Sequence, residues 1–277
     1  VYWFQSEIYA QVVAGVVTGP NWAVVIDTLA TPEETIEMRD FVQMTLNVPI
    51  RYVINTHYHA DHSWGNCFFP NAAIIAHTLC REKMERLGPD SLEEAKKQNP
   101  TFRASRIVLP NITFDSGAIT IRTGKKNLII SCTPGHSDDG ISVLVEEDKV
   151  LFAGDAFLPL PYIVDGDADA SIDTIKYIGS MGLENIIQGH GEIILRGEIE
   201  DAVKTNIQYI NCLKKAVKAA THRKNAADAL AAITIEECGK SRVYLGGLAE
   251  ELHKRNVKFL YRRMMGKIGA PEPQDII

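Results

Sequence analysis

The stretch His57-Tyr58-His59-Ala60-Asp61-His62 places three imidazoles and one carboxylate within six residues. The apolar run at residues 50–54 precedes it and predicts a buried strand that ends in a ligand-bearing loop. Imidazole nitrogen and carboxylate oxygen bind zinc and neighbouring transition metals. The sequence therefore predicts a metal site built around this loop.

The same arrangement recurs further along the chain. His136, Asp155 and His190 each follow a predicted strand, and each stands next to a glycine. Side chains at the same ends of several strands converge on one site. We therefore expect these three residues to complete the ligand set that begins at residues 57–62.

Apolar alternation and turn residues predict the secondary structure. Strands are expected at residues 9–17, 22–26, 50–55, 72–76, 107–109, 119–122, 127–132, 141–145, 150–152 and 186–187. The start signal Thr31-Pro32-Glu33-Glu34 predicts a helix, and further helices are expected at 77–98, interrupted at Gly88-Pro89, and at 171–181. From residue 198 onward the apolar spacing is helical.

Composition limits the class of protein. The chain has 277 residues, 45% of them hydrophobic and 23% charged, enough for a sizeable core in one large or two small domains. No apolar run approaches the ~20 residues that span a bilayer, so no membrane segment is predicted. Five irregularly spaced cysteines are expected to be free thiols, which favours a cytoplasmic location. The first residue is Val1 rather than Met, so a removed signal peptide stays an alternative.

Charge is distributed unevenly along the chain. Residues 1–202 carry a net charge of −13, whereas residues 203–277 carry +7. An acidic motif-bearing region repels a polyanion, so nucleic acid is not the expected partner. We interpret the basic residues of the C-terminal part as solvated helix faces.

Taken together, His57-x-His59-x-Asp61-His62, Gly135-His136, Gly154-Asp155 and Gly189-His190-Gly191 resemble the metallo-β-lactamase-fold superfamily over roughly residues 1–197. The resemblance implies an α/β (α+β) fold, a four-layer αβ/βα sandwich with a metal site at one edge between two sheets. It divides the chain into a catalytic domain, residues 1–197, and a C-terminal helical extension, residues 198–277, packed on it.

The resemblance implies two Zn²⁺ ions, with Fe or Mn as alternatives. Its seven ligands form a first site, a second site and a bridging carboxylate: His57, His59 and His136; Asp61, His62 and His190; and Asp155. Asp27 matches a buried carboxylate that supports the ligand loop.

The implied activity is that of a binuclear metal-dependent hydrolase, in which a hydroxide shared by the two ions attacks an ester, lactone or thioester. Asp61 is expected to orient the nucleophile and to carry a proton to the leaving group. Tyr162 is a candidate oxyanion donor by similarity to lactonases. Trp64, Phe157 and Leu158 are expected to wall a pocket for a small-molecule substrate.

Asp155 narrows the choice within the superfamily. Glyoxalase II, lactonases and related phosphodiesterases have a bridging Asp at this position, whereas true β-lactamases do not. The chain is therefore interpreted as glyoxalase II-like or lactonase-like. Four alternatives stay open: a persulfide-dioxygenase-like enzyme with one iron, a phosphodiesterase, a weak promiscuous β-lactamase and a non-catalytic scaffold. The C-terminal helices carry the stripe Leu245, Leu248, Leu252 and Phe259, which is consistent with capping the site, with a homodimer face or with simple packing on the sandwich.

Overall fold

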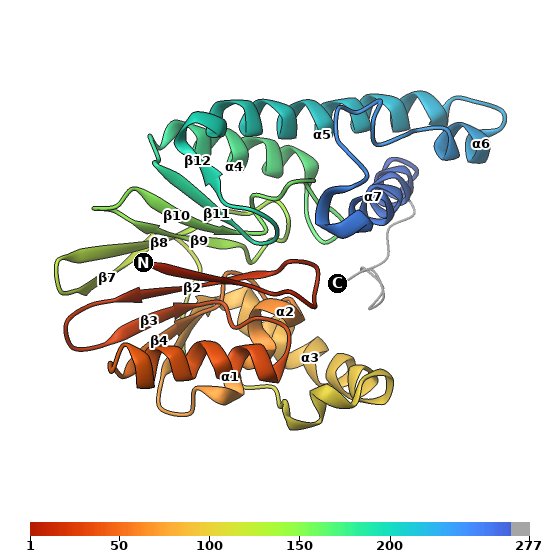
Figure 1. The fold of residues 1–277 in the computed structure, drawn as a ribbon. Coiled ribbons are helices and arrows are strands. Elements are labelled where there is room, and N and C mark those ends of the chain that lie inside the picture. Colours follow the sequence, from red (N-terminus) through yellow and green to blue (C-terminus); the bar gives the residue numbers. More distant parts are fainter. Residues whose placement is uncertain (267–277) are drawn as a thin grey trace.

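Two six-stranded sheets form the centre of the computed structural model, which describes residues 1–266 (Figure 1). The first sheet follows chain order, with strands β1 (Tyr2–Gln5), β2 (Val13–Thr18), β3 (Ala23–Ile26), β4 (Ile50–Ile54), β5 (Ala73–His77) and β6 (Ile112–Phe114). The second has the order β12-β11-β10-β9-β8-β7, with strands β7 (Ala118–Thr123), β8 (Lys126–Cys132), β9 (Ile141–Val145), β10 (Val150–Gly154), β11 (Asn185–Gln188) and β12 (Ile194–Leu195).

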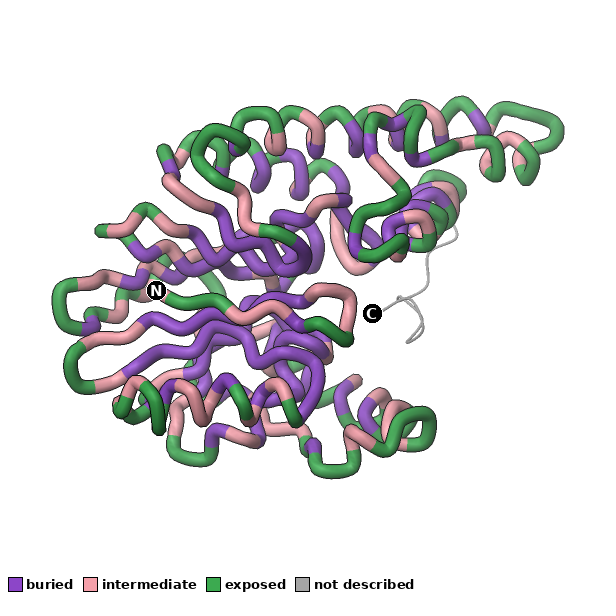
Figure 2. The backbone as a smooth tube through the Cα atoms, in the orientation of Figure 1, coloured by how far each residue is buried: buried purple, intermediate pink, exposed green. Residues whose placement is uncertain are grey.

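The sheets pack face to face through a shared apolar core. In β2, Val13 and Val17 belong to this core, whereas Ala14 and Val16 pack with the helix on the outer face. This alternation is the period of two that a strand imposes on its side chains. Figure 2 shows the resulting band of buried strands, with exposed residues at the turns.

Helices cover the outer face of each sheet. The helices on the first sheet are α1 (Pro32–Asp40), which continues into a π-helical turn (Phe41–Thr45), α2 (Ala60–Ser63) and α3 (Thr78–Gln98). The second sheet is covered by α4 (Ala168–Ser180) and α5 (Ile199–Thr221), followed by α6 (Ala226–Ala231) and α7 (Leu248–Met264). The predicted four-layer sandwich is confirmed.

The helices of the predicted extension share one core with the second sheet. Leu213 of α5 and Leu252 of α7 belong to the same buried cluster as Leu151 of β10 and Ile186 of β11. Residues 267–277 of that extension lie outside the described residues. Within the described part, no helix is long and apolar enough to cross a membrane.

Three predicted elements differ in the structure. Helix α3 runs without interruption through Gly88-Pro89, because Met84, Gly88 and Leu92 recur every fourth residue on one buried face. A Cβ at Gly88 would lie 3.1 Å from Ile107, so the glycine serves close packing rather than a break. The strand predicted at 107–109 is wrong: this segment is irregular, and β6 begins at Ile112.

The predicted N-terminal strand, residues 9–17, is also shifted. Strand β2 begins at Val13, because Ala10 and Gln11 have positive φ values of 46° and 53° and form a turn. A further strand at residues 2–5 was not predicted from the sequence.

Candidate metal centre

Strand direction brings the predicted ligands to one edge of the sandwich. β3 and β4 run parallel, as do β10 and β11, so the carboxyl ends of each pair lie together. His57 follows β4, while Asp155 and His190 follow β10 and β11. The ends of the two sheets touch, since the backbone N–H of Ile141 donates to the carbonyl of Thr56 at 2.8 Å.

Three imidazoles converge in a first group. Nδ1 of His59 lies 2.9 Å from Nε2 of His57 and 3.1 Å from Nε2 of His136. Nitrogens bound to one tetrahedral zinc ion are separated by ~3.3 Å, given Zn–N bonds of about 2.0–2.1 Å. The three ring nitrogens therefore already stand close to the spacing of a shared ion.

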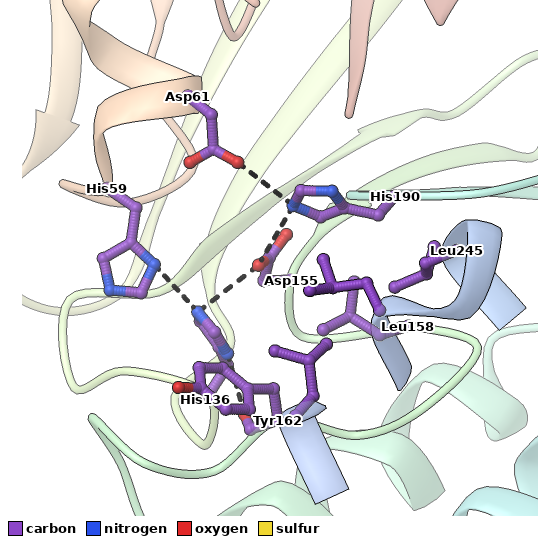
Figure 3. A pocket seen from close by; sticks show the side chains of 10 residues that line it. His59, Asp61, His136, Asp155, Leu158, Tyr162, His190 and Leu245 are labelled. Atoms are coloured by element: carbon purple, nitrogen blue, oxygen red, sulfur yellow. Dashed lines mark hydrogen bonds and ion pairs between the residues drawn. The ribbon is translucent and has the colours of Figure 1, made fainter. Parts of the chain in front are cut away.

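A second group lies beside the first, and Figure 3 shows Asp61 and His190 of the second group next to His59 and His136 of the first. Nε2 of His190 lies 3.3 Å from Oδ2 of Asp61, and Nε2 of His62 lies 3.8 Å from the same oxygen. Asp155 stands between the groups. Its Oδ2 is 3.4 Å from His136 and 3.6 Å from His190, and its Oδ1 is 3.3 Å from His62.

Asp27 holds the ligand loop from behind. Its carboxylate accepts hydrogen bonds from the backbone N–H and the hydroxyl of Thr56, both at 2.7 Å, and lies 2.9 Å from Nδ1 of His62. The Thr56 hydroxyl oxygen is 3.0 Å from Nδ1 of His57. Because the hydroxyl donates its hydrogen bond to Asp27, its oxygen accepts one from Nδ1 of His57. The lone pair of His57 therefore lies on Nε2, which faces the site.

Two other ligands are oriented by backbone carbonyls. Nδ1 of His136 lies 2.8 Å from the carbonyl of Tyr162, and Nδ1 of His190 lies 2.9 Å from the carbonyl of Ala10. A carbonyl only accepts, so each Nδ1 carries a proton and each Nε2 presents a lone pair to the cluster. The turn with positive φ at Ala10 thus positions a metal-site contact.

The carboxylates around His62 favour a bound cation at this site. Burial lowers the pKa of His57 well below its usual value and that of His136 to about 4, which keeps both imidazoles neutral. Burial would also lower the pKa of His62, but Asp61, Asp155 and Asp27 outweigh it and raise that pKa. Without a metal, the excess negative charge in the second group is thus balanced by protons, which metal binding displaces.

The residues fit a divalent metal. Nε2 of His62 and Oδ1 of Asp155 are buried 3.3 Å apart, an ion pair without hydrogen-bond geometry. Buried polar atoms without a hydrogen bond are costly, and coordination to an ion would satisfy both. Five imidazoles and two carboxylates are a donor set suited to zinc, iron or manganese.

A small cavity adjoins the ligands. Its free space is about 20 Å³, enough for roughly one water molecule. Apolar side chains wall it, contributed by the loop after β10 and by the chain at the start of α7: Leu158, Leu245, Leu248 and Leu252.

Of the other residues predicted at the pocket, Tyr162 lies at the cavity, whereas Trp64 and Phe157 have other packing partners. The Tyr162 side chain lines this cavity, with its ring centroid 6.0 Å from that of His136. Trp64 instead packs edge-on against Phe102, and Phe157 is buried in the core that β10 shares with the C-terminal helices.

One buried network was not anticipated from the sequence. Oδ2 of Asp165 lies 3.5 Å from Nε2 of His59 and accepts a hydrogen bond from Lys83 at 3.2 Å. Lys83 also reaches Asp139, whose carboxylate accepts from the backbone N–H of Tyr58. Asp165 is a single acidic residue in a loop, with no spacing that relates it to His59, so only the folded chain brings the two together.

Curated relatives share part of the chain. A lactamase-like protein nscB from Arthroderma benhamiae is 28% identical over 162 residues, which cover 58% of this chain and 32% of that protein. A beta-lactamase-like protein 2 homolog from Caenorhabditis elegans is 23% identical, over 63% of this chain and 55% of the homolog. The matched region therefore spans about half or less of these relatives' length.

Solved structures match more of the chain at lower identity. A metallo-beta-lactamase family protein from Thermus thermophilus superposes with a TM-score of 0.67 at 17% identity, covering 98% of this chain and 96% of that one. The sec-alkylsulfatase Pisa1 from Pseudomonas sp. gives a TM-score of 0.70 at 16% identity, covering 96% and 49%. At these identities the likeness concerns the fold alone. The family model described as metallo-beta-lactamase superfamily matches residues 9–190, the segment that carries every ligand of the cluster, and the chain belongs to that superfamily.

Proposed function

We propose that this protein is a binuclear metal-dependent hydrolase, with zinc as the expected metal and a carboxylic ester, lactone or thioester as its substrate. The observation that carries the proposal is the position of Asp155. Its carboxylate contacts His136 of the first group and both His62 and His190 of the second. One carboxylate shared by two ligand groups suits two neighbouring ions, and a bridging Asp is the feature of the glyoxalase II-like and lactonase-like branch.

Divalent ions bound here would supply a hydroxide nucleophile near neutral pH and would polarise the substrate oxygen. The protein's own groups perform the remaining tasks. Asp61 lines the cavity, with its Oδ2 3.3 Å from Nε2 of His190, and from this position its carboxylate can orient the nucleophile and accept its proton. We assign Tyr162, which lines the same cavity, as the candidate donor to the developing oxyanion.

The cavity wall supports an uncharged, apolar substrate. Leu158, Leu245, Leu248 and Leu252 stand beside the ligands, so the apolar part of an ester or lactone that reaches the metal centre would contact apolar side chains. A polynucleotide would need a positive groove, whereas the lining of this cavity contains no Lys or Arg. In this proposal residues 1–197 supply the ligands, and the extension from residue 198 supplies the apolar cap.

The decisive experiment combines metal analysis with a substrate panel. Protein purified without added metal is assayed for metal content, then tested on lactones, thioesters, carboxylic esters, phosphodiesters, β-lactams and a secondary alkyl sulfate. The alkyl sulfate is included because one structural neighbour is a sec-alkylsulfatase. We expect two zinc equivalents per chain and turnover of at least one carboxylic substrate, abolished by a chelator and restored by zinc. A single iron with oxygen uptake, or no carboxylic turnover, overturns the proposal.

A further inference from the structure

The loop between β10 and α4 reaches the metal centre through its backbone. The carbonyl of Tyr162 lies 2.8 Å from Nδ1 of His136 and fixes the proton on that atom. The direction of this carbonyl therefore sets how the imidazole of His136 faces the cluster. Whatever holds the peptide at Tyr162 in place also holds a metal ligand.

Asn256 of α7 holds that peptide from both sides. Its Nδ2 donates to the carbonyl of Pro161 at 2.8 Å, and its Oδ1 accepts from the backbone N–H of Ile163 at 3.0 Å. These two bonds bracket Tyr162, the residue between them. The Asn256 side chain is fully buried, so water does not compete for either bond.

The amide of Asn256 is itself fixed. Its second N–H points to the hydroxyl of Tyr209 on α5, 3.2 Å away, and that hydroxyl lies 3.0 Å from Nδ1 of His253. Nε2 of His253 donates to the carbonyl of Ile233 at 3.0 Å, which leaves Nδ1 to accept from the Tyr209 hydroxyl. Both donors and the acceptor of the amide are thus used, an arrangement that an Asp or an apolar residue cannot reproduce.

We propose that Asn256 is a positioning residue for the metal centre, acting through the Tyr162 carbonyl on His136. The C-terminal helix α7 then serves the site in two ways. Leu248 and Leu252 wall the cavity, and the buried Asn256 holds the peptide whose carbonyl orients His136. The inference rests on the metal centre of the proposed function, but not on the identity of the substrate.

The test measures metal affinity directly, by competition for Zn²⁺ with a chromophoric chelator. Asn256→Ala should lower the affinity about 10-fold, in the range seen when groups that orient metal-bound histidines are removed. In a His136→Ala background the same substitution should change the affinity less than about twofold, because its target is gone. Should Asn256→Ala fail to fold, Asn256→Ser takes its place in both backgrounds.

Tyr209→Phe is the matched control. It removes a buried hydrogen bond to Asn256 and should lower the thermal midpoint, yet it leaves the bonds to Pro161 and Ile163 in place. Its zinc affinity should stay within about twofold of the parent. An equal loss of affinity in the Asn256→Ala and Tyr209→Phe proteins, an equal loss in the two His136 backgrounds, or no loss at all overturns the inference. A protein that binds zinc as expected but hydrolyses no carboxylic substrate leaves it standing and refutes only the proposed function.

Discussion

Oδ2 of Asp27 lies 2.9 Å from Nδ1 of His62, and this contact ties the end of β3 to the loop that bears four of the ligands. Asp27 has a positive φ of 59°, a conformation that side chains other than glycine adopt at a cost. The same carboxylate also accepts from both donors of Thr56, its backbone N–H and its hydroxyl. One strained residue thus orients the ligand loop from behind.

Asp27→Asn should lower zinc affinity by about 10- to 100-fold, because His62 loses a charged acceptor for its Nδ1 proton. Competition with a chelator measures the change. Asp173→Asn, at an exposed position of α4, is the matched control and should leave the affinity as it is. Equal affinities of the Asp27→Asn and parent proteins would show that His62 does not need this support.

Leu248→Ala should shift substrate preference toward bulkier acyl groups. Leu248 lines the cavity from α7, and truncating it enlarges a space that now holds about one water. The ratio of kcat/KM for a long-chain ester to that for its short-chain homologue should rise about 10-fold. Metal content should not change, since the Leu248 side chain has no atom that could bind a metal or accept a hydrogen bond from a ligand. A ratio that stays constant would place the acyl chain elsewhere.

Lys83→Met should destabilise the metal-free protein by ~3 kcal/mol at pH 7, because it strands Asp139 and Asp165 without their cation. Burial would raise the pKa of Asp165, but His59 and Lys83 outweigh it and lower that pKa to about 2. A carboxylate whose pKa is lower in the folded than in the unfolded chain stabilises the fold at high pH, and this stabilisation is lost as the pH falls toward the folded pKa. The difference in free energy of unfolding between variant and parent, measured by urea unfolding, should therefore become smaller toward pH 3. Lys176→Met, at an exposed site, controls for loss of a surface charge.

Lys240 should increase the free energy of unfolding as the pH rises from 7 to 10. Burial lowers its pKa from 10.5 to about 8 against the smaller opposing effect of Asp201, and among the described residues its ammonium donates to the uncharged side chains of Asn206 and Thr205. Between these two values the unfolded chain holds the proton that the folded chain has released, so stability increases with pH. Relative to Lys240→Met, the parent should gain ~2 kcal/mol between pH 7 and pH 10. The exposed Lys254→Met variant should show no such trend, and a flat difference for Lys240 would mean that its ammonium is solvated.

The sequence predicted the ligand cluster because strand ends, glycines and ligand-type side chains recur in local patterns. It predicted the start of α1 for the same reason, since the hydroxyl oxygen of Thr31 accepts from the backbone N–H of Glu34, as the capping signal requires. The predicted interruption at Gly88-Pro89 is wrong, because the buried face of α3 continues through these two residues although both disfavour a helix. Packing decided that outcome, and packing is not visible in a window of neighbouring residues.

The supporting contacts of the site lay beyond sequence reasoning. Asp165 and His59 are 106 positions apart, and Asn256 stands 94 positions after the carbonyl it controls. The sequence points to the hydroxyl of Tyr162, whereas in the structure its backbone carbonyl also contacts Nδ1 of His136. Such contacts depend on how distant parts of the chain pack together, so no periodicity or residue spacing in the sequence indicates them.

Metal removal should lower the thermal midpoint markedly. An ion that binds only the folded chain adds about 4.1 kcal/mol of stability when its free concentration is 1,000 times the dissociation constant. Calorimetry with and without a chelator measures the change, and a midpoint that does not depend on zinc would contradict it. A variant lacking the carboxylate that joins both groups, Asp155→Ala, should show a smaller metal-dependent shift.

The ligands come from both halves of the sandwich, four from the loop after β4 and three from the loops after β8, β10 and β11. Ions bound here would therefore join chain segments more than 70 positions apart. The fraction of folded protein would then depend on the free metal concentration. In a metal-poor environment the chain would be cleared by proteolysis of its opened form, so its abundance would follow metal supply.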